Sequence, residues 1–232
     1  MPKTQFLVKK IVIFGKEFSY HLDILLFTIV VCFAVFFLCL WLKKKTSFFP
    51  TKRQIILESL LEWFDNILKE SNLKSRFFLS FIVSLFLFIL ISNCISVIPK
   101  FLSPTRDLNT CLGLALVVSV IAHINAIKTK GIKRYIKGYF SPYWWLFPSN
   151  VFSEISKTLS HSFRLFGNIF AGGIVISLVP TLILKLFKLW GILLVIFSLP
   201  ILKGFFDLFV GGIQAFVFTI LAVAYIGVLS QE

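Results

Sequence analysis

The chain has 232 residues, 58% of them hydrophobic, and its mean hydropathy of +0.92 excludes an ordinary soluble domain. Its formal net charge of +14 comes from basic residues that cluster between apolar runs rather than along one surface. Such clusters are typical of loops that set membrane topology, and they argue against a nucleic-acid-binding protein.

The first apolar run, residues 24–42, contains no charged residue and ends at the three lysines of 43–45. It lacks the small-residue cleavage pattern of a signal peptide, so we interpret it as a retained transmembrane helix. Residues 52–70 place apolar side chains on one helical face and charged side chains elsewhere. This segment is too charged to cross a membrane, and we predict an interfacial amphipathic helix that lies on the lipid.

Two further uncharged crossings are predicted at 77–98 and 108–127. The loop between them has two basic residues, whereas 43–76 has eight and 128–137 has five. The positive-inside rule therefore places the two basic loops on the cytoplasmic, matrix or stromal side. The first terminus then lies outside despite its four lysines, and its orientation stays open.

Residues 149–185 and 189–230 are two long apolar runs. At about 1.5 Å per residue they reach about 55–60 Å, nearly twice the ~30 Å hydrocarbon core. We therefore predict a strongly tilted hairpin, with Pro180 and Pro200 as breaks near its turn. Residues 1–232 are predicted to form a single all-α integral membrane domain with about three ordinary transmembrane helices, one interfacial helix and this hairpin. The four cysteines lie in apolar runs as packing residues, and we expect no bound metal.

Arg164 is the only formal charge in residues 158–184, and burial of arginine in hydrocarbon costs about 2.5–3.5 kcal/mol on insertion scales. Its neighbours at helical spacing form a polar stripe, which comprises Glu154, Lys157, Ser160, His161, Asn168 and Ala171. A second stripe on the last run comprises Lys203, Asp207, Gly211, Gln214 and Phe218. We predict that Gln214 pairs with Arg164 across the hairpin. The alternative is that Arg164 snorkels to the interface.

Several stretches resemble subunit a of the rotary F-type ATP synthase, in its bacterial form. They are SHSFRLFGNIFAG at 160–172, GGIQAFVFTILAVAYIG at 211–227, SPTRDLNT at 103–110, LLEWFDNIL at 60–68 and LFLFILISN at 85–93. The resemblance runs from about residue 50 to the end of the chain.

The resemblance implies a stator subunit of the F0 motor, with the hairpin facing a ring of c-subunits. Two aqueous half-channels would pass protons to and from the ring carboxylates and so couple ion flow to rotation and ATP synthesis. It implies no cofactor and no ATP chemistry on this subunit. The implied partners are the c-ring, subunit b of the peripheral stalk, other ATP synthase subunits and membrane lipid, with no nucleic acid.

Three residues match positions that the family uses. Arg164 matches its essential arginine, Gln214 the glutamine that faces this arginine, and Asn168 the asparagine one turn on. A fixed guanidinium attracts the ionised form of a ring carboxylate and blocks direct leakage between the half-channels.

Two positions depart from the family. Nine residues after the arginine, where the family generally has Glu or His, this chain has Gly173, and seven before the glutamine it has Asp207. We expect Asp207 alone to supply the ionisable relay of the inlet half-channel, with water filling the space beside Gly173. The alternative is a structural pairing of Asp207 with Lys203 or Lys188.

Other polar residues allow two interpretations each. Glu154 either lines the outlet half-channel or pairs with Lys157 at i+3. His161 either contributes to a half-channel or packs as a neutral ring. Asp107 either serves the mouth of the inlet or caps the helix that follows it. We interpret His123 as an interfacial or helix-packing group.

Two other functional classes stay open, a free-standing ion channel or transporter and a structural membrane anchor of a complex. The lack of an inverted repeat argues against a transporter. The coupling ion, proton or sodium, depends mainly on the partner ring, and we expect protons. The expected location is a bacterial plasma membrane, with a mitochondrial inner membrane or a plastid thylakoid membrane as alternatives.

Overall fold

A computed structural model describes residues 8–13, 16–43, 52–98, 103–141 and 143–231. It contains five helices that are long and apolar enough to cross a membrane, so the predicted multi-pass, helical membrane protein is confirmed. A hairpin of strands β1 (Val8–Ile13) and β2 (Lys16–His21) precedes the first helix, and it was not predicted. The two strands pair antiparallel, with Val8 opposite His21.

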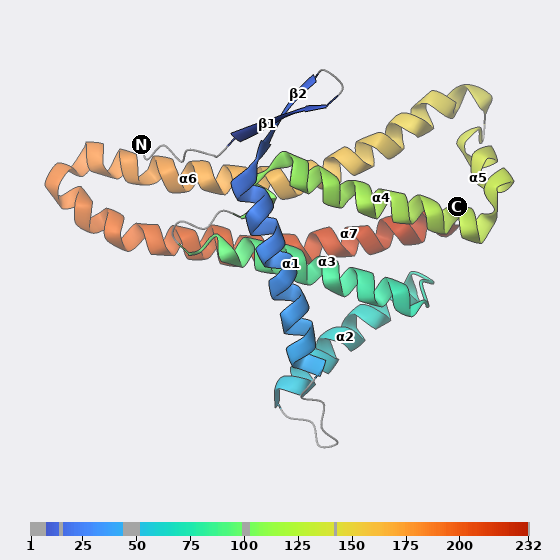
Figure 1. Ribbon diagram of the computed structural model, residues 1–232, viewed down its shortest axis with the longest axis horizontal. Coiled ribbons are helices and arrows are strands. Elements are labelled where there is room, and N and C mark those ends of the chain that lie inside the picture. The colour runs from blue at the N-terminus through green and yellow to red at the C-terminus, as the bar shows by residue number, and fades with distance from the viewer. Residues whose placement is uncertain (1–7, 14–15, 44–51, 99–102, 142, 232) are drawn as a thin grey trace.

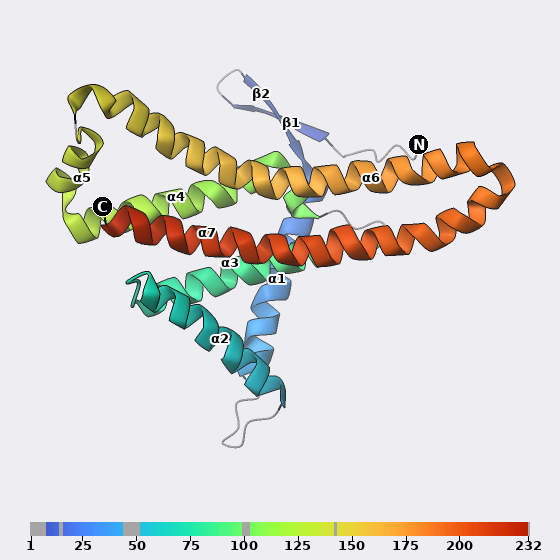
Figure 2. The ribbon, with the colours of Figure 1, turned by 180° about the vertical axis from the view of Figure 1, so that it is seen from behind.

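The first three helices are α1 (Leu22–Lys43), α2 (Lys52–Glu70) and α3 (Arg76–Ile95). In Figures 1 and 2, α1 crosses the other long helices at a steep angle, and α2 lies obliquely beside α3. Ser75 begins α3, because its side-chain oxygen accepts a hydrogen bond from the Phe77 backbone amide at 3.3 Å.

A glycine separates α4 (Leu108–Lys130) from α5 (Ile132–Tyr139). Gly131 has φ +78°, a backbone conformation that ends a helix and favours glycine. The short helix α5 lies in the basic loop and was not predicted, because its charged sequence contains no long apolar run.

The long hairpin consists of α6 (Phe147–Lys203), the π-helix η3 (Gly204–Val210) and α7 (Gly211–Gln231). Its turn is at Lys188, where φ is +46°; the first arm is 147–187 and the second arm is 189–231. The two arms run antiparallel in Figures 1 and 2.

The prediction that proline residues break the hairpin was wrong, because Pro180 and Pro200 both lie inside α6. Proline is tolerated in membrane helices when neighbouring groups satisfy the freed backbone carbonyl. The chain reverses so tightly that a Cβ atom at Gly191 would lie 2.9 Å from the carbonyl oxygen of Ile183. A glycine at this position, rather than a proline, therefore permits the return of the second arm.

The core lies where α3, α4, α6 and α7 meet. Its fully buried side chains include Ile82, Ile89, Val118, Ala122, Leu165, Phe218, Ala222 and Ile226. Alanine at several of these positions lets membrane helices approach closely. By contrast, α1 and the turn end of the hairpin expose many large apolar side chains, as expected of surfaces that face lipid.

The apolar face of α2 packs partly on protein. Phe64 and Leu68 are buried, and the Phe64 ring lies 5.3 Å from that of Phe86 on α3. Trp63 stacks on Phe216 of α7 with ring centroids 5.1 Å apart. This helix therefore packs against α3 and the second arm through part of its apolar face, and other apolar side chains, such as Ile55 and Ile56, stay exposed.

Candidate functional site

Two contacts set the register of the hairpin arms. The His161 ring lies 3.8 Å from the Phe218 ring, measured between centroids. Further along, a Cβ atom at Gly172 would lie 3.2 Å from the side chain of Phe206. The arms are therefore antiparallel and in step: moving one residue forward along the first arm corresponds to moving about one residue backward along the second.

This register places Arg164 level with Gln214. Gln214 is 8% exposed, and its Nε2 atom has no hydrogen-bond partner among the described residues. Arg164 is exposed, and no hydrogen bond joins it to Gln214 within the described part of the chain. The predicted pairing across the hairpin thus stays a prediction, although the two residues lie at one level.

Arg164 lies on a cavity of about 530 Å³ between α4, α6 and α7. The polar residues that line it are Ser153, Ser156, Lys157, Thr158, Ser160, His161, Arg164 and Tyr225. Among the described residues, no Asp or Glu side chain lines this cavity, and Arg164 takes part in no ion pair. Lys157 in this lining forms an ion pair with Glu154, so Arg164 is the cation of the cavity that has no ion pair within the described residues.

A second cavity, of about 380 Å³, lies beside α5 and the start of α6. Its lining includes Tyr135, Tyr139 and Glu154. Ser153 and Lys157 line both cavities, so the two are neighbours along the first arm.

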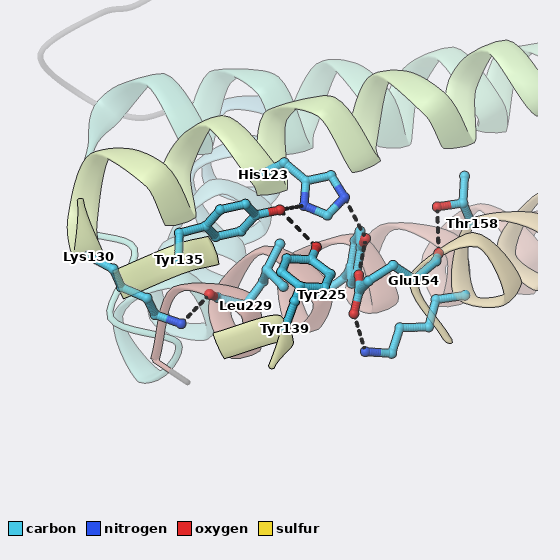
Figure 3. A network of polar contacts seen from close by, with 9 residues as sticks. His123, Lys130, Tyr135, Tyr139, Glu154, Thr158, Tyr225 and Leu229 are labelled. Atoms are coloured by element: carbon cyan, nitrogen blue, oxygen red, sulfur yellow. Dashed lines mark hydrogen bonds and ion pairs between the residues drawn. The ribbon is translucent and has the colours of Figure 1, made fainter. Parts of the chain in front are cut away.

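Glu154 lies in the lining of the second cavity and is hydrogen-bonded to a residue that lines the first. Its Oε1 atom accepts a hydrogen bond from Lys157 Nζ at 2.7 Å, and its Oε2 atom accepts one from the Tyr225 hydroxyl at 2.7 Å (Figure 3). Tyr225 lines the first cavity and Glu154 lines the second. The two interpretations of Glu154 are therefore compatible, since it pairs with Lys157 and also faces a cavity.

The network continues onto α4 and α5 (Figure 3). His123 Nε2 lies 3.5 Å from the Tyr225 hydroxyl, and His123 Nδ1 lies 2.8 Å from the Tyr135 hydroxyl. Tyr135 and Tyr139 share a hydrogen bond of 2.8 Å. Burial, and then the bond to Tyr135, raises the pKa of Tyr139, so this hydroxyl stays protonated at neutral pH.

Sequence reasoning interpreted His123 as an interfacial or helix-packing group and missed this chain of hydrogen bonds. Its partner Tyr135 is 12 positions away and Tyr225 is 102 positions away. No short motif links residues so far apart in the sequence. The only local signal of the network was the one-turn spacing of two tyrosines, Tyr135 and Tyr139, in α5.

Asp207 lies in η3. Along the hairpin it lies between the level of Arg164 and the turn, whereas Glu154 lies beyond Arg164 in the direction away from the turn. The Asp207 carboxyl group lies near Ser96, which follows the end of α3, and near the charged side chains of Lys203 and Arg106. Across the described ranges no ion pair joins Asp207 to a lysine, so the proposed structural pairing is not seen.

The space beside Gly173 holds a side chain. A Cβ atom added at Gly173 would lie 3.4 Å from Nη2 of Arg106. We expected water at this position. The structure instead places a guanidinium group there.

The remaining candidates lie around these groups. His161 lines the cavity of Arg164 and packs on Phe218, and its Nε2 atom is buried without a partner in the described residues. Asn168 is partly buried on the first arm. Asp107 occupies the N-cap position of α4, but its side chain makes no capping hydrogen bond in the described structure. The described residues contain no cluster that could hold a metal ion.

Comparison with known proteins gives one family. Residues 25–227 match the family described as ATP synthase A chain. The protein named ATP synthase subunit a in Acidothermus cellulolyticus is 38% identical over 216 residues, which cover 89% of this chain and 76% of that protein. Proteins of the same name in Staphylococcus aureus strains JH9 and Newman are 33% identical over 225 residues, which cover 92% of each chain.

The family match spans most of the chain, and the relatives align over nearly their whole length in two of these cases. It includes both arms of the hairpin with Arg164 and Gln214. The chain therefore belongs to the ATP synthase A chain family, as a multi-pass membrane subunit a of the F0 sector.

Proposed function

We propose that this chain is the stator subunit that passes protons through two aqueous half-channels to and from carboxylates of a c-ring. Ring rotation would couple this flow to ATP synthesis, with the ATP chemistry on other subunits. A subunit b stalk would hold the chain in place, in a bacterial plasma membrane like that of its bacterial relatives.

The observation that carries the proposal is the unpaired charge of Arg164. A guanidinium in a membrane-spanning segment is costly unless an anion meets it, and the described chain supplies none. A carboxylate of a neighbouring subunit would satisfy it. Arginine suits this role because it stays charged when desolvated and donates several hydrogen bonds to one carboxylate.

The outlet half-channel would follow the two cavities. They extend from Arg164 past Tyr225 and Glu154 to Tyr139 in α5, on the side of the basic loop. A proton released near Arg164 would therefore meet hydroxyl, amine and carboxylate groups rather than hydrocarbon. The positive-inside rule makes this the cytoplasmic side.

The inlet half-channel would approach from the opposite direction. Asp207 is partly buried in η3, and Asp107 lies at the nearby junction of η1 (Pro104–Arg106) with α4. A π-helical segment is frequently found at functional sites. Arg164 lies between this region and Glu154 along the hairpin, so a proton could cross only by travelling on the ring.

The test is Arg164→Ala in the complete ATP synthase. Assembly with the c-ring should persist, because the Arg164 side chain is exposed, while proton-driven ATP synthesis should fall below about 1% of the unmodified rate. The matched control is Arg134→Ala, an exposed arginine of α5, which should leave synthesis unchanged.

Two results would contradict the proposal. A structural anchor would retain ATP synthesis after Arg164→Ala. A free-standing channel would conduct ions in vesicles that contain this chain without a c-ring.

A further inference from the structure

We propose that His123 is a proton relay of the outlet half-channel: its imidazole takes a proton from the Tyr225 hydroxyl on one nitrogen and gives one to the Tyr135 hydroxyl from the other. This inference rests on the proposed function, which runs the outlet along the two cavities. It adds a path through protein groups from Glu154 to the second cavity, and it gives α4 a part in the outlet.

The first observation is the place of the imidazole between two hydroxyl groups (Figure 3). His123 Nδ1 lies 2.8 Å from the Tyr135 hydroxyl, which is the distance of a good hydrogen bond. His123 Nε2 lies 3.5 Å from the Tyr225 hydroxyl, a long contact that must shorten for a proton to pass. Catalytic hydrogen bonds are often long at rest and tighten only in the reacting state.

Aromatic packing decides which nitrogen of His123 faces which hydroxyl. The imidazole meets the Tyr135 ring at an interplanar angle of 74° and the Tyr225 ring at 82°, with centroids 6.1 and 6.2 Å apart. Both are edge-to-face arrangements, which aromatic pairs prefer. The ring is thus held on two sides, with Nδ1 toward α5 and Nε2 toward α7.

The second observation is that the hydrogen bonds of this chain have one consistent direction when Glu154 is ionised. The Tyr225 hydroxyl donates to Glu154 Oε2 at 2.7 Å, so its oxygen is left to accept from His123 Nε2–H. A neutral imidazole with its proton on Nε2 has an acceptor at Nδ1, which takes the Tyr135 hydroxyl as donor. Tyr135 in turn accepts from the Tyr139 hydroxyl at 2.8 Å. Every donor therefore points from α5 toward the carboxylate.

The direction is reversed when Glu154 carries a proton, and the transfer then balances. The carboxylic acid gives its proton to the Tyr225 oxygen, whose own proton moves to His123 Nε2. The imidazole releases its Nδ1 proton to Tyr135, and the Tyr135 proton moves on to Tyr139. The Tyr139 hydroxyl gives its proton to a water molecule of the second cavity. One proton enters and one leaves, Glu154 ends as the anion, and the imidazole has exchanged its tautomer.

His123 differs from the other members of this chain in two ways. Each tyrosine accepts and releases a proton at a single oxygen, whereas an imidazole does so at two separate atoms and spans the gap between α7 and α5. The ring also lines neither cavity, as the described residues outline them. The path through His123 is therefore separate from a water path along Ser153 and Lys157, which line both cavities.

The test uses variants of the complete ATP synthase, with c-ring content measured in each to confirm assembly. His123→Phe keeps an aromatic ring but removes both nitrogens, and proton-driven ATP synthesis should fall about tenfold. The loss should be partial, because the residues shared by the two cavities leave a water path beside the relay.

His123→Gln separates a relay from a positioning role. A glutamine side chain offers a donor and an acceptor, so it can hold both tyrosine hydroxyls in place. Its amide does not take up a proton at one atom and release one from the other. The rate should therefore fall about tenfold in this variant as well.

Tyr135→Phe removes the next link of the chain and should also lower the rate about tenfold. The double variant with His123→Phe should be no slower than either single variant, because a path that is already broken has nothing more to lose. Tyr143→Phe is the matched control, and this exposed tyrosine should give an unchanged rate.

Three results would overturn the inference. They are an unchanged rate for His123→Phe, a full rate for His123→Gln, or losses that multiply in the double variant. Any of them, together with a complex inactivated by Arg164→Ala, would leave the proposed function standing. Retained synthesis in Arg164→Ala would instead overturn the proposed function, and the inference with it.

Discussion

Glu154 and Arg164 lie ten residues apart on the first arm, yet their surroundings differ in kind. Glu154 has two partners in its own chain, Lys157 and the Tyr225 hydroxyl. Arg164 has no carboxylate partner in the described residues and faces a cavity. Under the proposed function, Glu154 would serve a path within the subunit, and Arg164 would serve a contact with another one.

Tyr225→Phe tests that path. The substitution removes the 2.7 Å hydrogen bond to Glu154 and the contact with His123, but keeps the ring and its packing. We expect ATP synthesis to fall about tenfold with normal assembly, since a hydroxyl between the two cavities is lost. The measurement is the proton-driven synthesis rate in membrane vesicles.

Tyr143→Phe is the matched control, because Tyr143 is 61% exposed. Equal rates in both variants would show that the Tyr225 hydroxyl is not part of the outlet.

At the scale of residues, short motifs were sufficient to predict Arg164, Gln214 and Asn168 as candidates, and their functional roles remain predictions. The His123 network and the guanidinium beside Gly173 were not predictable in this way. Both depend on side chains from separate elements, whose approach is set by helix packing rather than by spacing along the chain.

Among the elements, the hairpin shows which features of the sequence decide a turn. Length and hydropathy indicated two arms at 149–185 and 189–230, and the structure has its turn at Lys188. The prolines were misleading because the helix continues through them, whereas the close return at Gly191 becomes visible only when both arms are in place.

Gly191→Ala should therefore weaken the hairpin. The added methyl would lie 2.9 Å from the Ile183 carbonyl oxygen, and overpacking of this kind costs about 1–3 kcal/mol. We expect the detergent-solubilised complex to lose the subunit at a temperature several degrees lower, as measured by native electrophoresis after heating.

The same substitution at Gly113 of α4 is the control, since a Cβ atom there meets nothing within 4 Å in the described structure. Alanine also favours helix over glycine by about 1 kcal/mol. A Gly191→Ala complex as stable as the Gly113→Ala complex would show that the turn has room to relax.

Over the whole molecule, the membrane topology follows from where the charges lie. The basic residues of α5 and those around α2 are predicted to face the cytoplasm, and the hairpin turn at Lys188 the opposite side. The strands β1 and β2 were not anticipated, because their lysines were interpreted only as topology signals.

Single cysteines at two positions test this topology. In a cysteine-free complex, Lys137→Cys should react with a membrane-impermeant maleimide only from the cytoplasmic side, and Lys188→Cys only from the other side. Labelling of intact cells against inverted vesicles measures the difference. Labelling of both positions from the same side would rule out a hairpin that crosses the membrane.

The unequal burial of the two arms has a mechanical consequence. In α7, the side chains of Phe218, Ala222 and Ile226 are fully buried where this helix packs against α3, α4 and α6, whereas most of the first arm is exposed. The far end of α7 meets the α2–α3 connection, where a Cβ atom at Gly227 would lie 3.1 Å from Ser71. We therefore expect that a sideways force on the hairpin would reach α3 and α2 through α7, because α7 packs on α3 and its Phe216 stacks on Trp63 of α2.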